Sequence, residues 1–376
     1  MMSSIDHMFL YTVLMLLFTA FAFFYYDVRG EVLFFFGATV MSAIYALITG
    51  TRYGWGADYL LYKYRFEHVL SFDEPQIGFK LINSTIDQLN LNYVGAFVVY
   101  GFLFSICTLL LIRSYKAASQ YMYLFWIPSS IIFTTGLIRQ GVALSFIMLM
   151  ILAINRGKYW LSLLPLAIAI SIHASSFITA GIIYLCYFFF RNPFNWRYTI
   201  PIYLIFTFLI DSSIITKFSS ELFGALRLGW IFDGYTENAD QWFGDESVDL
   251  NYQQGFVQKF LTAVFHLSIF YSGYYACKAL NSRKVTCIYN VVVIGMITLR
   301  IFFLIEILRR IAQPLEMLNF IIIGLIFYYF GSKNRKNENY SIANMLCVLA
   351  IVVYSTLFMT RFIFFSPNLN FFWNVV

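Results

Sequence analysis

Two ionisable residues, Arg139 and His173, stand out in this chain because they border long apolar runs. The first run turns near Gly157, and the second returns from that turn to His173. Arg139 precedes the turn by about as many residues as His173 follows it, so at about 1.5 Å per residue both should lie roughly 25 Å from the turn. Ionisable groups at a membrane face are costly and usually functional. A cation beside a group that titrates near neutral pH could hold an anion and move a proton.

The overall composition indicates what kind of protein must position these residues. Of 376 residues, 60% are hydrophobic and only 12% are charged, whereas soluble domains carry about 25% charged residues. Apolar stretches of about 20 residues recur along the chain, and a segment in lipid must pair its own backbone polar groups. The sequence therefore predicts an all-α polytopic integral membrane protein.

The apolar runs predict about 12 transmembrane helices in a single transmembrane domain over residues 1–376, and a GT-C-like architecture is compatible with that number. Lys and Arg concentrate in alternate loops, which the positive-inside rule places in the cytoplasm, so that both termini face outward. Two external loops, at about 51–92 and 216–255, are long enough to form a site. The predicted spans are 8–26, 32–49, 93–112, 121–137, 139–154, 160–173, 176–190, 199–215, 256–278, 286–305, 312–330 and 342–360.

The predicted outer face carries more arginine than lysine. Arginine binds phosphate and carboxylate groups in a bidentate fork and keeps its charge when partly desolvated. An arginine-rich outer face therefore favours an anionic ligand. The structural alternative is that each arginine reaches to lipid headgroups or pairs with a nearby carboxylate.

The first external loop combines charge with aromatic residues. If a helix runs from Asp58 onward, Asp58 and Tyr62 share one of its faces, because they are four residues apart. An amphipathic stretch follows from Gly78 to Leu91. The structural alternative is an interfacial ion pair between Arg52 and Asp58, with the aromatic side chains in the membrane's aromatic belt.

Two further regions could contribute to an external site. The loop at 216–255 interleaves carboxylates with tryptophan and tyrosine, a mixture that suits sugar rings, although an ordinary solvated loop has the same composition. Farther along, Arg309 and Arg310 point about 100° apart on a helix, so only one of them should face a cavity. We select Arg310, which Glu306 could hold from one turn earlier.

No cofactor chemistry is evident. The four histidines lack ligand spacing, and neither a phosphate-binding glycine loop nor a dinucleotide motif is present, so we expect no metal and no cofactor. No nucleic-acid partner is expected. His266 lies within an apolar span and is interpreted as a packed polar contact. A membrane acyltransferase would need such a deep histidine, but no partner for His266 is evident from the sequence.

Several short motifs occur together along the chain. They are Arg52, Gly54, Asp58, Tyr59, Tyr62, Glu74-Pro75, Arg139-Gln140, Ala143, His173, Ser175 and Arg310-Ile311. With these motifs the chain resembles the EpsG family of bacterial polysaccharide polymerases, and it is similar to Wzy-type polymerases of O-antigen, capsule or exopolysaccharide. The resemblance spans nearly the whole chain in topology. The tail at 367–376 departs from it, because it lacks the Pro-Tyr-type ending of many members.

The resemblance implies an enzyme in the bacterial cytoplasmic (inner) membrane, with its active site facing the periplasm or exterior. Such enzymes transfer one undecaprenyl-pyrophosphate-linked oligosaccharide onto another, so donor and acceptor are both lipid-linked glycans. Membrane lipids and a chain-length regulator protein are the other expected partners. The donor carries its own leaving group, which agrees with the lack of a nucleotide motif.

The reaction needs cations for the departing pyrophosphate, a base for the acceptor hydroxyl and a surface for sugars. We assign pyrophosphate contacts to Arg139 and Arg310, with Arg52 third. His173 or Asp58 would take the acceptor proton; the structural alternative for His173 is a helix-end residue bonded to a following serine. The expected substrate contacts also include Gln140, Tyr59 and Tyr62.

Two other functions remain open at this point. A flippase for lipid-linked oligosaccharides would also need arginines, but they should line a path through the membrane midplane, whereas these lie near one face. A glycan ligase of the O-antigen ligase type would use nearly the same external site. Identifying the acceptor separates the ligase from the polymerase.

Overall fold

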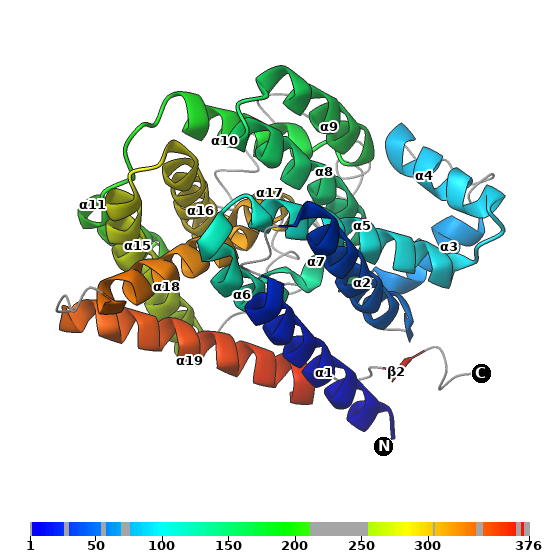
Figure 1. Ribbon diagram of the computed structural model, residues 1–376, viewed down its shortest axis with the longest axis horizontal. Coiled ribbons are helices and arrows are strands. Elements are labelled where there is room, and N and C mark those ends of the chain that lie inside the picture. Colours follow the sequence, from blue (N-terminus) through cyan, green and yellow to red (C-terminus); the bar gives the residue numbers. More distant parts are fainter. Residues whose placement is uncertain are drawn as a thin grey trace. The chain divides into compact units, whose positions relative to one another are not determined.

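The structure is a computed structural model, which describes residues 2–25, 30–53, 58–68, 76–210, 255–303, 305–335, 341–365 and 370–371 (Figure 1). Gly54, Glu74-Pro75 and most of the 216–255 loop lie outside the described residues, and so does the side chain of Glu306. The predictions made for these residues stay predictions.

The chain divides into two compact units. The first unit comprises Met1–Gly181, Ile323–Lys336 and Ser355–Val376, and the second comprises Ile182–Ile322 and Asn337–Tyr354. The prediction of a single transmembrane domain stays a prediction.

Helices dominate both units, as the composition predicts. Among the described residues, six helices are long and apolar enough to cross a membrane. The chain is therefore a polytopic helical membrane protein, and the figure of twelve spans stays a prediction. The six candidate spans are Glu31–Gly50, Tyr93–Arg113, Ile138–Asn155, Arg283–Ile301, Leu308–Ser332 and Ile342–Thr360, and shorter apolar helices lie at Phe9–Phe24, Tyr159–Ile172 and Ser176–Phe188.

The first unit is built on the long helices α2, α5 and α8, which pack side by side. Helix α9 returns along α8, and the short helices α3 and α4 lie against α5 (Figure 1). The elements that begin in this unit are α1 (Met2–Tyr25), α2 (Glu31–Gly50), β1 (Arg52–Tyr53), α3 (Tyr59–Glu67), α4 (Ile77–Gln88), α5 (Tyr93–Arg113), η1 (Lys116–Ala118), α6 (Ser119–Ser130), α7 (Ile132–Thr135), α8 (Ile138–Asn155), α9 (Tyr159–Ile172) and α10 (Ser176–Phe188).

A small antiparallel pairing joins two distant parts of the first unit. Arg52 of β1 lies opposite Phe371, and Tyr53 lies opposite Asn370, where Asn370–Phe371 is β2. The pairing ties the segment after α2 to the C-terminal tail. Nothing in the local sequence predicts it, because both strands are only two residues long.

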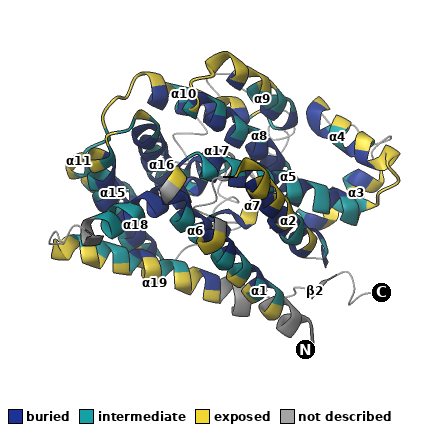
Figure 2. Ribbon diagram, viewed as in Figure 1, coloured by how far each residue is buried: buried dark blue, intermediate teal, exposed yellow. Residues whose placement is uncertain are grey.

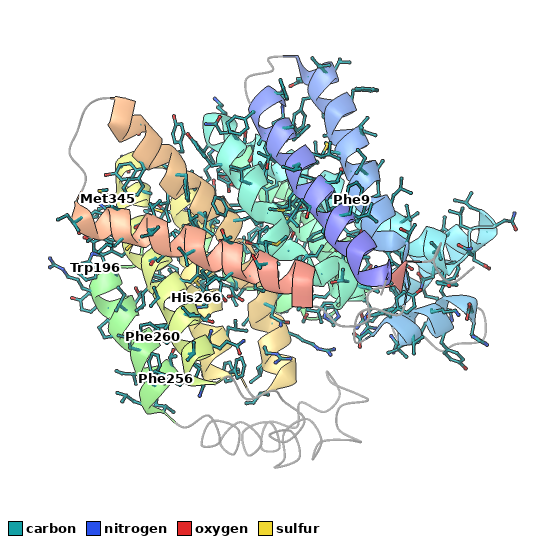
Figure 3. All side chains as sticks on the ribbon, turned by 90° about the horizontal axis from the view of Figure 1, so that it is seen from below. Phe9, Trp196, Phe256, Phe260, His266 and Met345 are labelled. Atoms are coloured by element: carbon teal, nitrogen blue, oxygen red, sulfur yellow. The ribbon has the colours of Figure 1, made fainter. Side chains whose placement is uncertain are left out.

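The second unit packs α16 against α15 and α17. The turn between α15 and α16 is tight, because Asn281 takes a left-handed conformation with φ of 42°. Phe256 and Phe260 expose their rings near the start of α15 (Figure 3), as expected for side chains that face lipid. The elements of this unit are α11 (Trp196–Leu204), η2 (Ile205–Leu209), α15 (Phe256–Leu280), α16 (Arg283–Ile301) and α17 (Glu306–Met317), and α18 (Asn319–Arg335) and α19 (Ile342–Phe365) contribute to both units.

Two predicted spans are less regular than the hydropathy pattern suggests. The predicted span 121–137 consists of two consecutive helices, α6 and α7. The predicted span 199–215 starts within α11 and continues as the π-helical η2. Pro128 lies inside α6 and Pro201 inside α11, and a proline in a helix interior removes one backbone hydrogen bond.

Candidate active site

The hairpin of α8 and α9 brings Arg139 and His173 to the same end of the first unit. Arg139 is the second residue of α8, and His173 follows the last residue of α9. At the other end, Gly157 takes φ of +73°, a conformation that suits glycine and lets the chain reverse sharply. The matching heights that the sequence predicts are thus found in the structure.

A cluster of buried hydrophobic residues lies at this end of the hairpin. Ile138 and Ile172, the immediate neighbours of Arg139 and His173, belong to it. Tyr59 and Tyr62 of α3 are also members, and Tyr62 packs edge-on to Phe79 of α4 with 5.8 Å between ring centroids. The predicted external segment therefore folds onto the hairpin end, where it carries its aromatic residues beside the two ionisable ones.

Helix α4 is amphipathic, as predicted. Its buried residues Gly78, Phe79, Asn83 and Ile86 recur at helical spacing, and other positions of the helix are exposed (Figure 2). Asn83 accepts a hydrogen bond from the hydroxyl of Tyr100 on α5. This polar contact within the buried interface helps to fix the register of α4 on α5.

Tyr62 lies among three charged side chains. Burial raises the pKa of its hydroxyl, and the negative charge of Asp58 acts in the same direction, whereas the positive charges of Arg139 and Arg65 lower it. The hydroxyl also bonds to the backbone of Arg139. The backbone N–H of Tyr62 donates to the carbonyl of Asp58 over 2.9 Å, as the predicted helical spacing requires. The structure therefore brings Asp58, Tyr62 and Arg139 together.

Arg65 belongs to the same group, although no role was predicted for it. Its guanidinium lies 5.7 Å from the ring centroid of Tyr62. Arg65 follows Tyr62 by three residues on α3, so the two side chains share a helix face. That spacing is the sequence signal that could have identified Arg65.

Arg52 is buried, with only 1% of its surface exposed. It donates hydrogen bonds to the carbonyl of Thr49 and, over 3.3 Å, to that of Thr135. Its guanidinium lies 5.7 Å from the ring centroid of Tyr59 and 5.2 Å from that of Phe97. Burial lowers the pKa of Arg52 to about 10, so the side chain keeps its charge at neutral pH.

Through these contacts Arg52 connects two helices. They join the end of α2 to α7, and Arg139 lies just beyond α7 at the start of α8. Direct contact between Arg52 and pyrophosphate stays a prediction.

Gly78 sets how closely α4 approaches α9. A Cβ atom added at this position would lie 2.2 Å from the Ser171 hydroxyl oxygen and 2.8 Å from the Ser171 backbone carbon. Ser171 stands just before the end of α9, close to His173. The missing side chain therefore lets α4 pack beside the His173 end of the hairpin.

We expect Gly78→Val to lower the stability of the protein by about 1–3 kcal/mol, because the added atoms overpack the α4–α9 contact. The measurement is thermal unfolding of purified protein in detergent. Gly181→Val is the matched control, since a Cβ at Gly181 meets nothing within 4 Å. Equal midpoints for the two variants would contradict the close contact.

Of the remaining predicted residues, Gln140 belongs to the first unit and Arg310 to the second. Gln140 is buried near the start of α8. Arg309 and Arg310 are both half-buried on α17, in the second unit. The described residues contain no group of three or more histidine, cysteine or carboxylate side chains that could hold a metal ion.

The second unit contains a buried polar group that the sequence did not reveal. His266 bonds through Nδ1 to the hydroxyl of Tyr203 and through Nε2 to Glu316. The packed polar contact predicted for His266 is confirmed, and the structure supplies the partners that were not evident from the sequence. Its partners lie 63 and 50 residues away along the chain, too far for local spacing to identify them.

Comparison with known proteins gives one match. The sequence model of the EpsG family matches residues 34–374, which is most of the chain. No curated protein matches the chain, and no solved structure does.

Proposed function

Since the chain belongs to the EpsG family, which comprises Wzy-type polysaccharide polymerases, we propose that it joins undecaprenyl-pyrophosphate-linked oligosaccharide repeat units by glycosyl transfer. The observation that carries the proposal is the group formed by Arg139, Asp58 and Tyr62, with His173 at the same end of the hairpin. The group combines a cation, a carboxylate, an imidazole and an aromatic hydroxyl. Glycosyl transfer from a pyrophosphate donor uses such groups.

The reaction breaks one bond and forms another. An acceptor sugar hydroxyl attacks the anomeric carbon of the donor glycan, and the bond from that carbon to the pyrophosphate oxygen breaks. Negative charge accumulates on the departing undecaprenyl pyrophosphate, and a base takes the proton of the acceptor hydroxyl. The donor supplies the free energy, so this reaction needs no nucleotide.

Arg139 is the residue that we assign to the departing pyrophosphate in the first unit. Its guanidinium can hold two phosphate oxygens at once. The bond from Tyr62 to its backbone and the buried neighbour Ile138 hold the start of α8 in place. Positive charge fixed in a partly desolvated site stabilises developing negative charge more than the same charge in water.

Arg310 has the same proposed role from α17, and Gln140, Tyr59 and Tyr62 contribute to binding of the glycan. Because the rings of Tyr59 and Tyr62 pack in the buried cluster, the part that we propose for these two residues in glycan binding is to hold the neighbouring residues of the site in place. Arg52 contributes indirectly, because its hydrogen bond to the carbonyl of Thr135 holds the end of α7, just before the start of α8.

The location of the enzyme follows from the same proposal. The site faces outward from the bacterial cytoplasmic membrane, as the charge bias of the loops predicts. A bundle of about 12 spans with a GT-C-like arrangement would carry it, and a chain-length regulator would act beside it.

The test is turnover by purified protein supplied with its lipid-pyrophosphate-linked repeat unit, read as a ladder of lengthening glycans. A ladder supports the polymerase. Movement of the intact unit across liposome membranes, with no ladder, would instead establish a flippase. Transfer of single glycans to a different lipid or to a protein would establish a ligase.

The same assay identifies the base, for which His173 and Asp58 are the candidates. Replacing the base should slow turnover by about 10²–10⁴-fold. If His173 is the base, added imidazole should restore part of the activity of His173→Ala and none of that of Asp58→Asn. Asp58 becomes the base if Asp58→Asn shows the larger loss and imidazole has no effect on His173→Ala. If both variants keep their activity, neither His173 nor Asp58 is the base.

A further inference from the structure

Four side chains from four helices of the second unit form one continuous chain of hydrogen bonds. The Nε atom of Arg300, on α16, donates to the hydroxyl oxygen of Tyr203, on α11, over 2.9 Å. The same hydroxyl lies 2.8 Å from Nδ1 of His266, which occupies the middle of α15 (Figure 3). The Nε2 atom of His266 lies 3.0 Å from Oε1 of Glu316, on α17. We call these four residues the Arg300–Glu316 chain.

Arg300 fixes the direction of the first hydrogen bond in this chain. Arg300 can only donate, so the oxygen of Tyr203 accepts from it. In the tautomer of His266 whose Nδ1 accepts from the Tyr203 hydroxyl, Nε2 carries the hydrogen that Glu316 accepts. Arg300 at one end and Glu316 at the other are thus linked through a tyrosine and a histidine.

Burial makes this arrangement costly to disturb. Tyr203 and His266 are 0% and 1% exposed, and Arg300 is 6% exposed. The side chain of Glu316 is 23% exposed, so it forms the accessible end. Breaking one link would leave a buried polar group without its partner, which typically costs about 1–3 kcal/mol.

The helix held by this chain is α17. A Cβ atom added at Gly295 of α16 would lie 2.6 Å from the backbone nitrogen of Glu316 and 2.8 Å from the backbone carbon of Leu315. The α17 backbone therefore touches α16 directly at the level of Glu316, and the carboxylate of Glu316 is held by His266 of α15. The first contact sets the distance of α17 from its neighbours, and the second limits its rotation.

Rotation matters because α17 also carries Arg310, less than two turns before Glu316. Successive residues of an α-helix point about 100° apart, so a rotation of about 100° would exchange Arg310 for Arg309 on the face that meets a ligand, and a smaller rotation would already turn Arg310 away from that ligand. A displacement of about 1 Å in a group that meets the transition state can cost about 10²-fold in rate. Contacts that fix the rotation of α17 therefore decide which of the two arginines faces the ligand.

We propose that the Arg300–Glu316 chain positions α17 so that Arg310 meets the leaving pyrophosphate, and that Tyr203, His266 and Glu316 are positioning residues of the reaction. This inference rests on the proposed function. In this proposal His266 does not touch the substrate and affects glycosyl transfer only through the position of α17. The positioning role also explains why a membrane protein keeps three buried polar side chains together with a partly buried carboxylate, where apolar side chains would pack without such constraints.

The test is a double-mutant cycle with Tyr203→Phe and Arg310→Ala, measured as kcat and KM in the ladder assay. Tyr203→Phe removes only the hydroxyl, and we expect kcat to fall by about 10- to 100-fold, with little change in KM. In the Arg310→Ala background the same substitution should change kcat by less than about twofold, because the residue through which it acts is gone. Glu316→Gln, which keeps the shape of the side chain, should behave in the same way if Tyr203→Phe fails to fold.

The matched control is Tyr289→Phe. Tyr289 is a fully buried tyrosine of α16, and its hydroxyl donates to the carbonyls of Phe270 and Phe194 rather than to the chain. We expect Tyr289→Phe to lower stability without the selective loss of kcat. Fully multiplicative effects of Tyr203→Phe and Arg310→Ala, or equal kcat for the two tyrosine variants, would overturn the positioning role. Failure of the proposed function is distinct, because the wild-type protein would then make no ladder at all.

Discussion

Arg139→Ala should lower the rate of glycan-ladder formation by about 10²–10³-fold and leave the fold intact. The reason is the proposed contact with the departing pyrophosphate, whose negative charge rises in the transition state. Loss of a preorganised donor at such a position removes stabilisation from the transition state more than from the bound substrate. The fall should therefore appear in kcat, with a smaller effect on KM.

Arg139→Lys should fall between the wild type and Arg139→Ala. Lysine keeps the positive charge but lacks the planar fork that holds two oxygens at once. A graded series of arginine, lysine and alanine at this position would indicate both charge and geometry. A lysine variant as inactive as the alanine variant would assign the whole effect to geometry.

The control is Arg156→Ala. Arg156 lies just past the other end of the same helix, α8, and is exposed. It should keep its turnover, because it stands at the far end of the hairpin from His173. Equal losses for Arg139→Ala and Arg156→Ala, or turnover of Arg139→Ala within about twofold of the wild type, would remove Arg139 from the site.

Arg52→Met should give the largest loss of stability among the variants considered, about 3 kcal/mol or more. Arg52 donates to two backbone carbonyls, Thr49 and Thr135, and hydrogen bonds to a charged group contribute about 1.5–3 kcal/mol each. Methionine fills much of the space but offers no donor, so both carbonyls lose this partner. The contacts of the guanidinium with the rings of Tyr59 and Phe97 would be lost as well.

Replacing Arg52 should also affect the position of Arg139 in the candidate site. Thr135 ends α7, and the start of α8 with Arg139 follows within one helical turn. We therefore expect the Arg52→Met protein that remains folded to turn over more slowly than the wild type. Arg52→Lys should recover part of the stability, since an ammonium group can reach a carbonyl but cannot span two in the same plane.

Thermal unfolding and the yield of monodisperse protein in detergent measure this prediction. Arg191→Met is the matched control, because Arg191 is exposed in the segment after α10. We expect its unfolding midpoint to equal that of the wild type. If Arg52→Met also unfolds at the wild-type temperature, the inference that Arg52 stabilises the connection between α2 and α7 is wrong.

Several features of the site could be predicted from short-range patterns. The length of the apolar runs on either side of Gly157 placed Arg139 and His173 at one end of a hairpin, since the rise of a helix per residue is constant. The spacing of Asp58 and Tyr62 predicted their shared helix turn, and the amphipathic pattern predicted α4. Each of these features depends on residues close together in the chain.

Other features could not be predicted in this way. The hydrogen bond from Arg52 to Thr135 joins residues 83 positions apart, and those of His266 join residues 63 and 50 positions apart. The proximity of Arg139 to Tyr62 likewise depends on α3 packing at the start of α8.

The sequence by itself determined the membrane class, the helical hairpin and the family of this protein, because composition, apolar length and short motifs are properties of single segments. The tertiary structure decided which partners the buried polar groups take. Apolar helices offer one another similar surfaces, so hydropathy does not specify which two will pack. The choice depends on close approaches such as those at Gly78 and Gly295, and on a few buried hydrogen bonds between distant residues, which exist only once the helices are assembled.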